Sequence, residues 1–204
     1  QVTNKQPSSR WYSGSGIYRD VTLSYRDKVH VAENGNHITT PKLAEQKEGN
    51  VETQVQSKIK NTDKKAAKVF VEQQIFTKEG KVVSELVRSE TKNLAENEVA
   101  DFRQTILVNK PTLWTTKSYH PQLYVLKTKV YKEGQLVDVT EDTFGYRYFN
   151  WTAKDGFSLN GERMKFHGVS IHHDNGALGA EENYKATYRK LKLLKDMGEN
   201  SIRT

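Results

Sequence analysis

The sequence predicts a mainly β protein, with an immunoglobulin-like β-sandwich over residues 27–147 followed by the start of an α/β barrel. Three observations predict this fold class. Apolar and polar residues alternate strictly in several segments, which is typical of half-buried strands. These segments recur about every 8–12 residues between turn residues, as in an antiparallel sandwich. After residue 155 the pattern changes to strand, helix and strand, which predicts a parallel βα unit.

The strands of the predicted sandwich follow a period of two. In segment 51–59 every second position belongs to one face, and its residues are Val51, Thr53, Val55, Ser57 and Ile59. Segments 69–76 and 123–131 follow a similar pattern. Glu79-Gly80 and Glu133-Gly134 predict hairpin turns with strands on both sides. The chain has no cysteine, so the prediction concerns the immunoglobulin-like architecture and not an antibody domain.

A polar loop interrupts the predicted sandwich between two prolines, Pro111 and Pro121, which stop regular strand pairing. Trp114 and Tyr124 are large side chains at its two ends. We expect them to hold the loop against the sandwich. A ligand-stacking role for Trp114 is the alternative.

A hairpin and a strand lead into the predicted barrel. Asn160-Gly161 accepts the positive φ angles of a two-residue turn. The following segment, 164–171, predicts a strand that delivers His172 and His173 at its carboxyl end. Polar residues at such a strand end, followed by a helix, are typical of the active-site face of an α/β barrel.

The helix of the βα unit is predicted from its apolar stripe, which consists of Tyr184, Thr187, Tyr188, Leu191 and Leu194. Glu181 and Glu182 fall where a first helical turn favours negative charge. Gly198 is predicted to end the helix, since glycine accepts the left-handed conformation found there. Residues 200–204 then begin another strand. A shorter strand is predicted at 17–23, near the other end of the chain.

Composition excludes several classes of protein. The 204 residues carry a net charge of +7, but acids and bases interleave over 42–98, and no arginine-rich or aromatic-basic block suggests a nucleic-acid partner. No apolar run approaches the ~20 residues of a membrane span. The absence of cysteine excludes disulfides and thiolate metal sites and favours a bacterial extracellular or cell-surface location over a cytoplasmic one.

The chain has no initiator methionine, and it stops after the second strand of a parallel pair, which cannot cover its own faces. We therefore expect it to be an internal piece of a longer protein.

Six motifs occur in a characteristic order. They are Gly14-Ser-Gly-Ile-Tyr-Arg-Asp20, Pro111-Thr-Leu-Trp114 with Pro121-Gln-Leu-Tyr124, Gly145-Tyr-Arg147, Asp155-Gly-Phe-Ser-Leu-Asn-Gly161, His167-Gly-Val169 with His172, and Asn200-Ser-Ile-Arg203. Together they resemble glycoside hydrolase family 2, and within it the β-galactosidases. The resemblance implies that residues 1–26 end a jelly-roll sugar-binding domain, that 27–147 form the immunoglobulin-like sandwich, and that 148–204 begin a (β/α)₈ TIM barrel.

One motif departs from the family. Where members usually have Arg-Gly-Val-Asn-Arg-His, this chain has His167-Gly-Val-Ser-Ile-His172, and His173 stands where a Glu usually follows. The pocket should therefore differ in detail, and we expect His173 to be structural.

The resemblance implies a retaining exo-β-galactosidase that works by double displacement with two Glu residues. Both lie on later barrel strands in the family, so no catalytic residue is assigned here, and the isolated chain should be inactive. Glu181 and Glu182 are interpreted as helix residues. The resemblance leaves β-glucuronidase and β-mannosidase open, and the sequence also leaves open a non-catalytic immunoglobulin-like adhesion or spacer module.

Three residues are expected to line the sugar pocket by resemblance. Asp20 would accept hydrogen bonds from sugar hydroxyls and, in some members, helps to hold sodium. His172 matches a substrate-contacting histidine, and Arg203 an arginine that keeps the nucleophile ionised. The alternatives are an ion-paired strand Asp, a loop histidine and an ordinary strand-end arginine.

The resemblance further implies that no cofactor is required, although the full-length enzyme could hold sodium or magnesium. The expected partners are β-galactoside oligosaccharides or glycans, without nucleic acid or membrane insertion, and a homo-oligomer is left open.

Overall fold

The computed structural model describes residues 3, 5, 17, 19–172 and 175–204. The chain divides into two compact units. One unit contains residues 25–164, and the other contains residues 165–204 together with the described residues among 1–24. Residues 148–164 therefore belong to the same compact unit as the sandwich. The limits predicted from the family layout, 1–26, 27–147 and 148–204, stay predictions.

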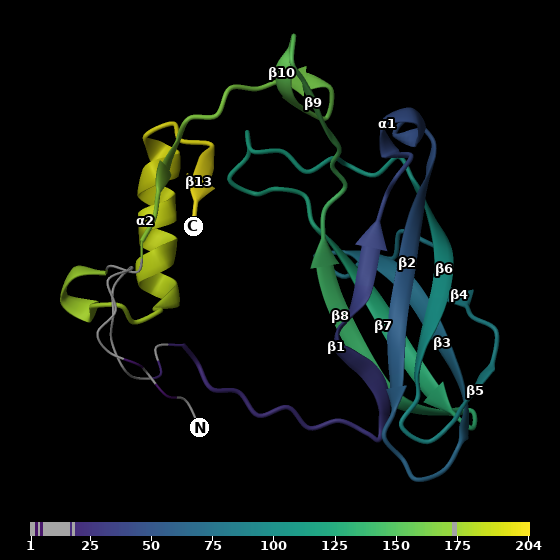
Figure 1. Ribbon diagram of the computed structural model, residues 1–204. Helices are drawn as coiled ribbons and strands as arrows, with labels where there is room; N and C mark the ends of the chain where they lie inside the picture. The colour runs from purple at the N-terminus through teal and green to yellow at the C-terminus, as the bar shows by residue number, and fades with distance from the viewer. Residues whose placement is uncertain (1–2, 4, 6–16, 18, 173–174) are drawn as a thin grey trace. The chain divides into compact units, whose positions relative to one another are not determined.

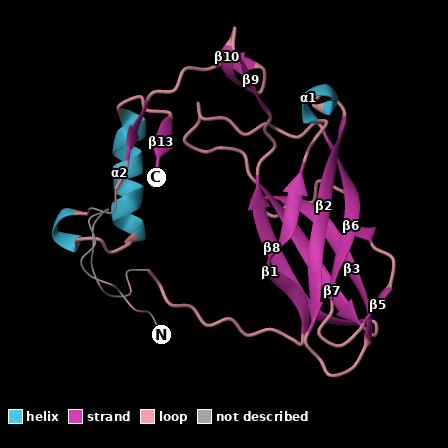
Figure 2. Ribbon diagram, in the orientation of Figure 1, coloured by secondary structure: helices cyan, strands magenta, loops and turns pink. Residues whose placement is uncertain are grey.

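Two antiparallel sheets build the sandwich, as Figures 1 and 2 show, and a small sheet of order β11-β10-β9 (Glu162–Arg163, Gly156–Leu159 and Phe149–Thr152) belongs to the same unit. The first sheet has the order β1-β2-β6, from β1 (Val29–Thr39), β2 (Asn50–Asn61) and β6 (Val99–Asn109). The second has the order β4-β3-β7-β8, with β5 also paired to β3; its strands are β3 (Ala67–Thr77), β4 (Val87–Arg88), β5 (Lys92–Leu94), β7 (Tyr124–Lys132) and β8 (Gln135–Phe144). A single helical turn, α1 (Leu43–Gln46), lies between β1 and β2. The predicted immunoglobulin-like sandwich is confirmed.

The alternation predicted for segment 51–59 is confirmed in β2, because all five residues of the inward set are buried. The inward side chains of the two sheets form two apolar clusters. One cluster contains Val29, Val31, Ile59, Ala67, Val69, Val71, Leu94, Phe102 and Val130. The other contains Leu43, Val51, Val55, Ile75, Ile106, Val108, Tyr124, Leu126 and Tyr146.

A layer of hydrogen-bonded polar side chains separates the two apolar clusters. Asn36 on β1 donates to the Asp142 carboxylate (2.6 Å) and accepts from the Ser57 hydroxyl (2.5 Å). Gln73 on β3 donates to Ser57 (2.8 Å) and to Thr128 on β7 (3.0 Å). Since a buried polar group without a partner is costly, this layer fixes the strands to one register.

The tight turns follow the predicted chemistry. Glu133 and Gly134, with φ angles of 49° and 81°, join β7 to β8. Asn160 and Gly161, with φ angles of 54° and 85°, join β10 (Gly156–Leu159) to β11 (Glu162–Arg163). The prediction at Glu79-Gly80 was only partly right: the turn forms, but only isolated bridges follow it before β4.

A parallel strand–helix–strand arrangement forms the rest of the described chain. It consists of β12 (Gly168–Ser170), a 3₁₀ turn η1 (Gly176–Leu178), α2 (Tyr184–Asp196) and β13 (Ser201–Arg203). Asn183 begins α2, since its side-chain oxygen accepts the Ala186 N–H (3.1 Å). Gly198, with a φ angle of 93°, ends it as predicted. No helix among the described residues is both long enough and apolar enough to cross a bilayer.

Three predictions about the chain outside the sandwich were wrong. The strand predicted over 164–171 is only three residues long, because β13 pairs with Gly168–Ser170 alone. Glu181 and Glu182 precede the helix and do not lie in its first turn, because the cap is at Asn183. The described residues of 17–23 form no strand. They pair with no strand of the described chain, and Val21 and Leu23 are exposed.

Candidate functional site

The carboxyl end of the parallel pair β12/β13 is the candidate site. The two strands pair Gly168 with Ser201, Val169 with Ile202, and Ser170 with Arg203. The Ile171 N–H donates to the Arg203 carbonyl at 2.8 Å, so the pairing continues to the last residue before His172. His172 and Arg203 therefore lie at the same end of two parallel strands.

The amino end of the pair is held by a side-chain amide. Asn200 accepts the His167 N–H (3.0 Å) and donates to the Lys165 carbonyl (2.9 Å). Gly168 faces Ser201 so closely that a Cβ at this position would collide with the Ser201 carbonyl and hydroxyl. These contacts explain why the motifs containing His167-Gly168 and Asn200-Ser201 belong together: they fix the register that places Arg203 beside the end of β12.

The register also determines which side chains share a face. Ser170 and Arg203 are direct partners, and side chains at paired positions project to the same side of a sheet. His172 follows Ser170 by two positions, and both His172 and Arg203 are exposed. The guanidinium of Arg203 makes no hydrogen bond or ion pair within the described chain. An imidazole and a guanidinium at one edge can donate to sugar hydroxyls or to a carboxylate.

The other predicted site residues are less defined. Asp20 is exposed and precedes the sandwich unit, and within the described chain it makes no hydrogen bond or ion pair with His172 or Arg203. His173 and most of the motif that ends at Asp20 lie outside the described residues. Within the described chain, no group of three His, Asp or Glu side chains could hold a metal ion. The sodium role of Asp20 stays a prediction.

Trp114 and Tyr124 build a corner of the sandwich. The Tyr124 hydroxyl accepts the Thr112 N–H at 2.9 Å, and its ring packs edge-on against buried Tyr146 at 4.9 Å. The backbone N–H of Trp114 donates to the Tyr146 carbonyl (2.8 Å), and the Arg147 guanidinium lies 4.9 Å from the centre of the Trp114 ring. These contacts support the anchoring role for both aromatic residues.

Tyr146 is the buried centre of this corner. Its hydroxyl is 2.7 Å from the Thr53 hydroxyl on β2, and burial raises the pKa of Tyr146 above its ordinary value. Gly145 lies against Trp114, where a Cβ would approach the Trp114 Cβ to 3.0 Å. The Gly145-Tyr146-Arg147 motif is thus explained by packing, since each of its residues contacts the corner.

Sequence reasoning missed an aromatic face on the hairpin that follows the corner. Phe157 on β10 is paired with Trp151 on β9 (Phe149–Thr152), at a ring distance of 5.6 Å, and stacks on Phe149 at 6.3 Å. Phe149 and Trp151 are 69% and 66% exposed. Their spacing of two residues on one short strand is the signal that could have revealed this face.

Comparison with known proteins identifies the family of this chain. The model of glycosyl hydrolases family 2 matches residues 29–147, which is more than half of the chain. This chain belongs to glycosyl hydrolase family 2. The matched segment is the sandwich, from the first residue of β1 to the Arg147 of the corner.

Relatives match over nearly the whole chain. The β-galactosidase BoGH2A of Bacteroides ovatus is 39% identical over 199 residues, covering 98% of this chain and 23% of the relative. A solved family 2 member from Bacteroides cellulosilyticus superposes with a TM-score of 0.85 at 34% identity, covering 95% of this chain and 24% of that one. A β-glucuronidase of Bacteroides uniformis was solved covalently bound to cyclophellitol-6-carboxylate aziridine. It superposes with a TM-score of 0.80 at 27% identity, covering 93% of this chain and 23% of that one.

The chain thus spans about a quarter of the length of these family 2 relatives. Their names include both a β-galactosidase and a β-glucuronidase, so membership of the family does not by itself fix the sugar. The fold is shared with these glycoside hydrolases.

Proposed function

We propose that the complete protein is a retaining exo-β-galactosidase and that this chain supplies its sandwich and the first sugar-binding edge of its catalytic region. The observation that carries the proposal is the placement of His172 and Arg203 at one end of the parallel pair, in a family 2 chain that is 39% identical to a β-galactosidase. In α/β barrels the carboxyl ends of the strands carry the active site.

The proposed reaction is a double displacement. A carboxylate attacks the anomeric carbon while a second carboxylic acid protonates the leaving oxygen, which gives a glycosyl-enzyme; water then releases the sugar as the second carboxylate takes its proton. The relative solved in covalent linkage to an aziridine supports a nucleophilic step of this kind. We assign neither carboxylate to residues 1–204. Glu181 and Glu182 precede α2 and are exposed.

The residues of this chain would act around those two carboxylates. Arg203 carries a fixed positive charge, which lowers the pKa of a neighbouring carboxyl group and keeps a nucleophile ionised. His172 would hold a sugar hydroxyl through a ring nitrogen, and Asp20 would accept hydrogen bonds from a pair of hydroxyls. Sodium or magnesium binding, assembly into a homo-oligomer and an extracellular location remain parts of the proposal.

A β-glucuronidase is the second candidate, because a β-glucuronidase superposes on 93% of this chain. The sugars of the two activities differ in the orientation of the C4 hydroxyl and at C6, where the glucuronide carries a carboxylate in place of a hydroxymethyl group. The departure at Ser170-Ile171 lies beside His172, where it can change the contacts to that part of the substrate.

The test is hydrolysis of 4-nitrophenyl β-D-galactoside and 4-nitrophenyl β-D-glucuronide by the complete protein, with proton NMR to identify the first anomer released. Preferential cleavage of the galactoside with release of the β-anomer supports the proposal. Cleavage of the glucuronide alone would replace it by the second candidate. Absence of hydrolysis of any β-glycoside would favour a non-catalytic module.

A further inference from the structure

The outer face of the β1-β2-β6 sheet carries a polar groove that none of the predicted functions uses. Six side chains form it in two rows across three strands. The strand pairing places His37, Gln56 and Arg103 in one row and Thr39, Gln54 and Thr105 in the next. The groove has a volume of about 330 Å³, at the lower end of the range typical of small-molecule sites.

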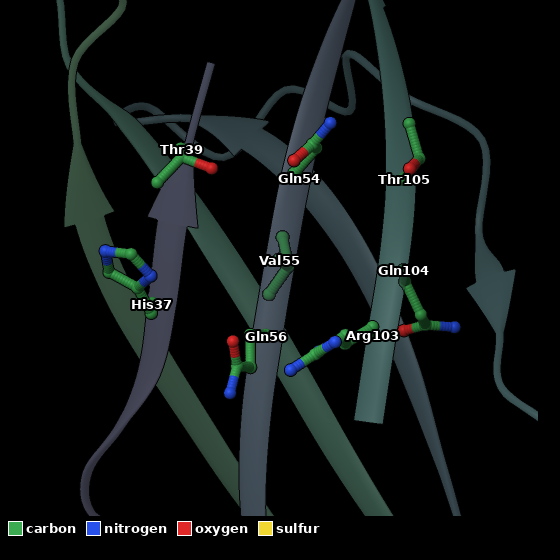
Figure 3. Close-up of a pocket in the computed structure, with 8 residues that line it drawn as sticks. All are labelled: His37, Thr39, Gln54, Val55, Gln56, Arg103, Gln104 and Thr105. Atoms are coloured by element: carbon green, nitrogen blue, oxygen red, sulfur yellow. The ribbon is translucent and has the colours of Figure 1, made fainter. Parts of the chain in front are cut away.

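The backbone explains why these six side chains share a face. They alternate along their strands with buried residues such as Val55 and Gln104, which face the interior. Figure 3 shows Arg103 extending from β6 toward Gln56 on β2, while Gln104 is turned away. From strand and residue spacings, the two rows cover an area of about 10 Å by 7 Å.

The polar groups of the groove have few partners within the described chain. The side chains of His37, Gln54 and Gln56 make no hydrogen bond within the described chain. Arg103 has one weak partner, the Asp101 carboxylate at 3.8 Å, and is 74% exposed. The side chains of Thr39 and Thr105 likewise make no hydrogen bond to the described residues. The groove therefore offers hydroxyl, amide, imidazole and guanidinium groups to a ligand.

The opposite sheet shows a different pattern on its outer side. There, Lys127 binds the Glu141 carboxylate at 2.8 Å and lies over the Phe76 ring. The Arg88 guanidinium lies 3.6 Å from the centre of the Phe70 ring. Lys127 and Arg88 are thus engaged within the protein, whereas Arg103 is held only loosely.

The charge of the groove selects the kind of ligand. None of its eight lining residues is acidic, and Arg103 is one of them. Lys58 extends the basic character along β2, beside Asp101 at the margin. A carboxylate is complementary to this charge and forms short, paired hydrogen bonds with a guanidinium. The amides and hydroxyls around it match a ligand that also carries several hydroxyl groups.

We infer that this groove is an accessory binding site for a uronate residue of a glycan, with the sugar carboxylate on Arg103 and the sugar hydroxyls on Gln54, Gln56 and the two threonines. A uronate combines one carboxylate with several neighbouring hydroxyls on a ring that fits the area of the two rows. The site lies on the sandwich and takes no part in bond cleavage. It would hold an acidic glycan on the protein whichever terminal sugar the complete protein removes.

The experiment is a titration of the ¹⁵N-labelled 204-residue chain, followed by proton–nitrogen correlation spectra. The probes are methyl β-D-glucuronide and its neutral counterpart methyl β-D-glucoside. We expect the glucuronide to shift amide signals within segments 37–39, 54–56 and 103–105 and to saturate at millimolar concentration. Loss of the charged hydrogen bonds should weaken binding about tenfold for the glucoside and for the Arg103→Gln variant.

Arg163→Gln is the matched control, because Arg163 is an exposed arginine on β11 of the same unit. It should bind the glucuronide like the unmodified chain, and the spectra themselves report whether each variant is folded. Three results would each overturn the inference: equal binding by Arg103→Gln, equal binding of the two probes, or shifts spread over the surface that disappear with added salt. No hydrolysis is measured, so this outcome is independent of the proposed catalytic function.

Discussion

Asp63 shows how one carboxylate connects distant parts of the sandwich. It follows β2 and accepts hydrogen bonds from Lys132 at the end of β7 (2.8 Å) and from Lys28 ahead of β1 (3.3 Å). The hydrogen bond from Lys132 is the main reason that the pKa of Asp63 falls from 3.8 to about 2, with Lys28 and the Lys64 N–H contributing further. The ionised form of Asp63 is therefore favoured in the folded state.

This shift gives a prediction for the acid range. A carboxyl group with a lowered pKa stabilises the folded state above its unfolded pKa, and that contribution is lost as pH falls through the folded value. The difference in unfolding midpoint between the unmodified chain and Asp63→Asn should be constant above about pH 5 and shrink between about pH 4 and pH 2. Urea denaturation at several pH values measures it. Glu96→Gln, at an exposed loop position, is the control.

A difference that stays constant down to pH 2 would show that the Asp63 contacts do not favour its ionised form. For the control Glu96→Gln, the difference in unfolding midpoint from the unmodified chain is expected to stay constant. The Glu96 carboxylate accepts a hydrogen bond from the Asn97 amide and has no pair of lysines comparable to those at Asp63.

At the scale of single elements, the β10–β11 hairpin is the one that the sequence predicts most completely. Asn160 and Gly161 both have positive φ angles, and the Asn160 side chain also donates to the Trp114 carbonyl at 2.8 Å. The hairpin needs only local information, because an Asn-Gly turn specifies the pairing of the residues on either side.

Gly161→Ala should therefore destabilise the hairpin. Gly161 has a φ angle of 85°, and a Cβ there would lie 3.0 Å from the Tyr148 hydroxyl. We expect a loss of about 1–2 kcal/mol in the free energy of unfolding. Gly49→Ala is the control, since a Cβ at Gly49 would have no neighbour closer than 3.9 Å. Equal unfolding curves for the two variants would contradict this account of the turn.

The polar layer of the sandwich gives the second prediction at this scale. Ser57 accepts a hydrogen bond from Gln73 and donates one to Asn36, and it is fully buried. Ser57→Ala would leave both amides short of a partner, at a cost of about 1–3 kcal/mol. Denaturant unfolding measures this loss, and Ser118→Ala in the exposed loop should change it by less than about 0.5 kcal/mol. A neutral Ser57→Ala would show that the layer does not contribute to stability.

Other elements depend on partners that local pattern cannot reveal. The apolar run at 164–171 was predicted as a full strand, but β13 is short and pairs with only Gly168–Ser170. The alternation at 17–23 was also interpreted as a strand, although no ladder partner lies in the described chain. By contrast, the inward set of β2, Thr53 and Ser57 included, was predicted correctly because its period is local. Local alternation predicts which face of a strand is buried, whereas the existence and length of a strand also depend on the neighbouring strand.

At the scale of the whole molecule, the chain combines a family 2 sandwich with a parallel strand–helix–strand unit. The predicted sandwich and the shared end of His172 and Arg203 could be found from the sequence, because turns, alternation and ordered motifs specify them. The polar groove and the aromatic hairpin face could not, since the groove depends on the register of three strands that are distant in sequence. Asp20 stays a predicted site residue, because no hydrogen bond or ion pair in the described chain connects it to the other two.

In the complete protein, we expect the carboxyl end of β12 and β13 to contact the substrate. The most direct measurement is kcat/KM of the complete protein carrying Arg203→Ala or His172→Ala, with Arg189→Ala on the exposed face of α2 as the matched control. We expect kcat/KM to fall on the order of 100-fold or more for the first two variants at unchanged melting temperature, and not to fall for the control. Rates close to those of the unmodified protein for both site variants would contradict this expectation.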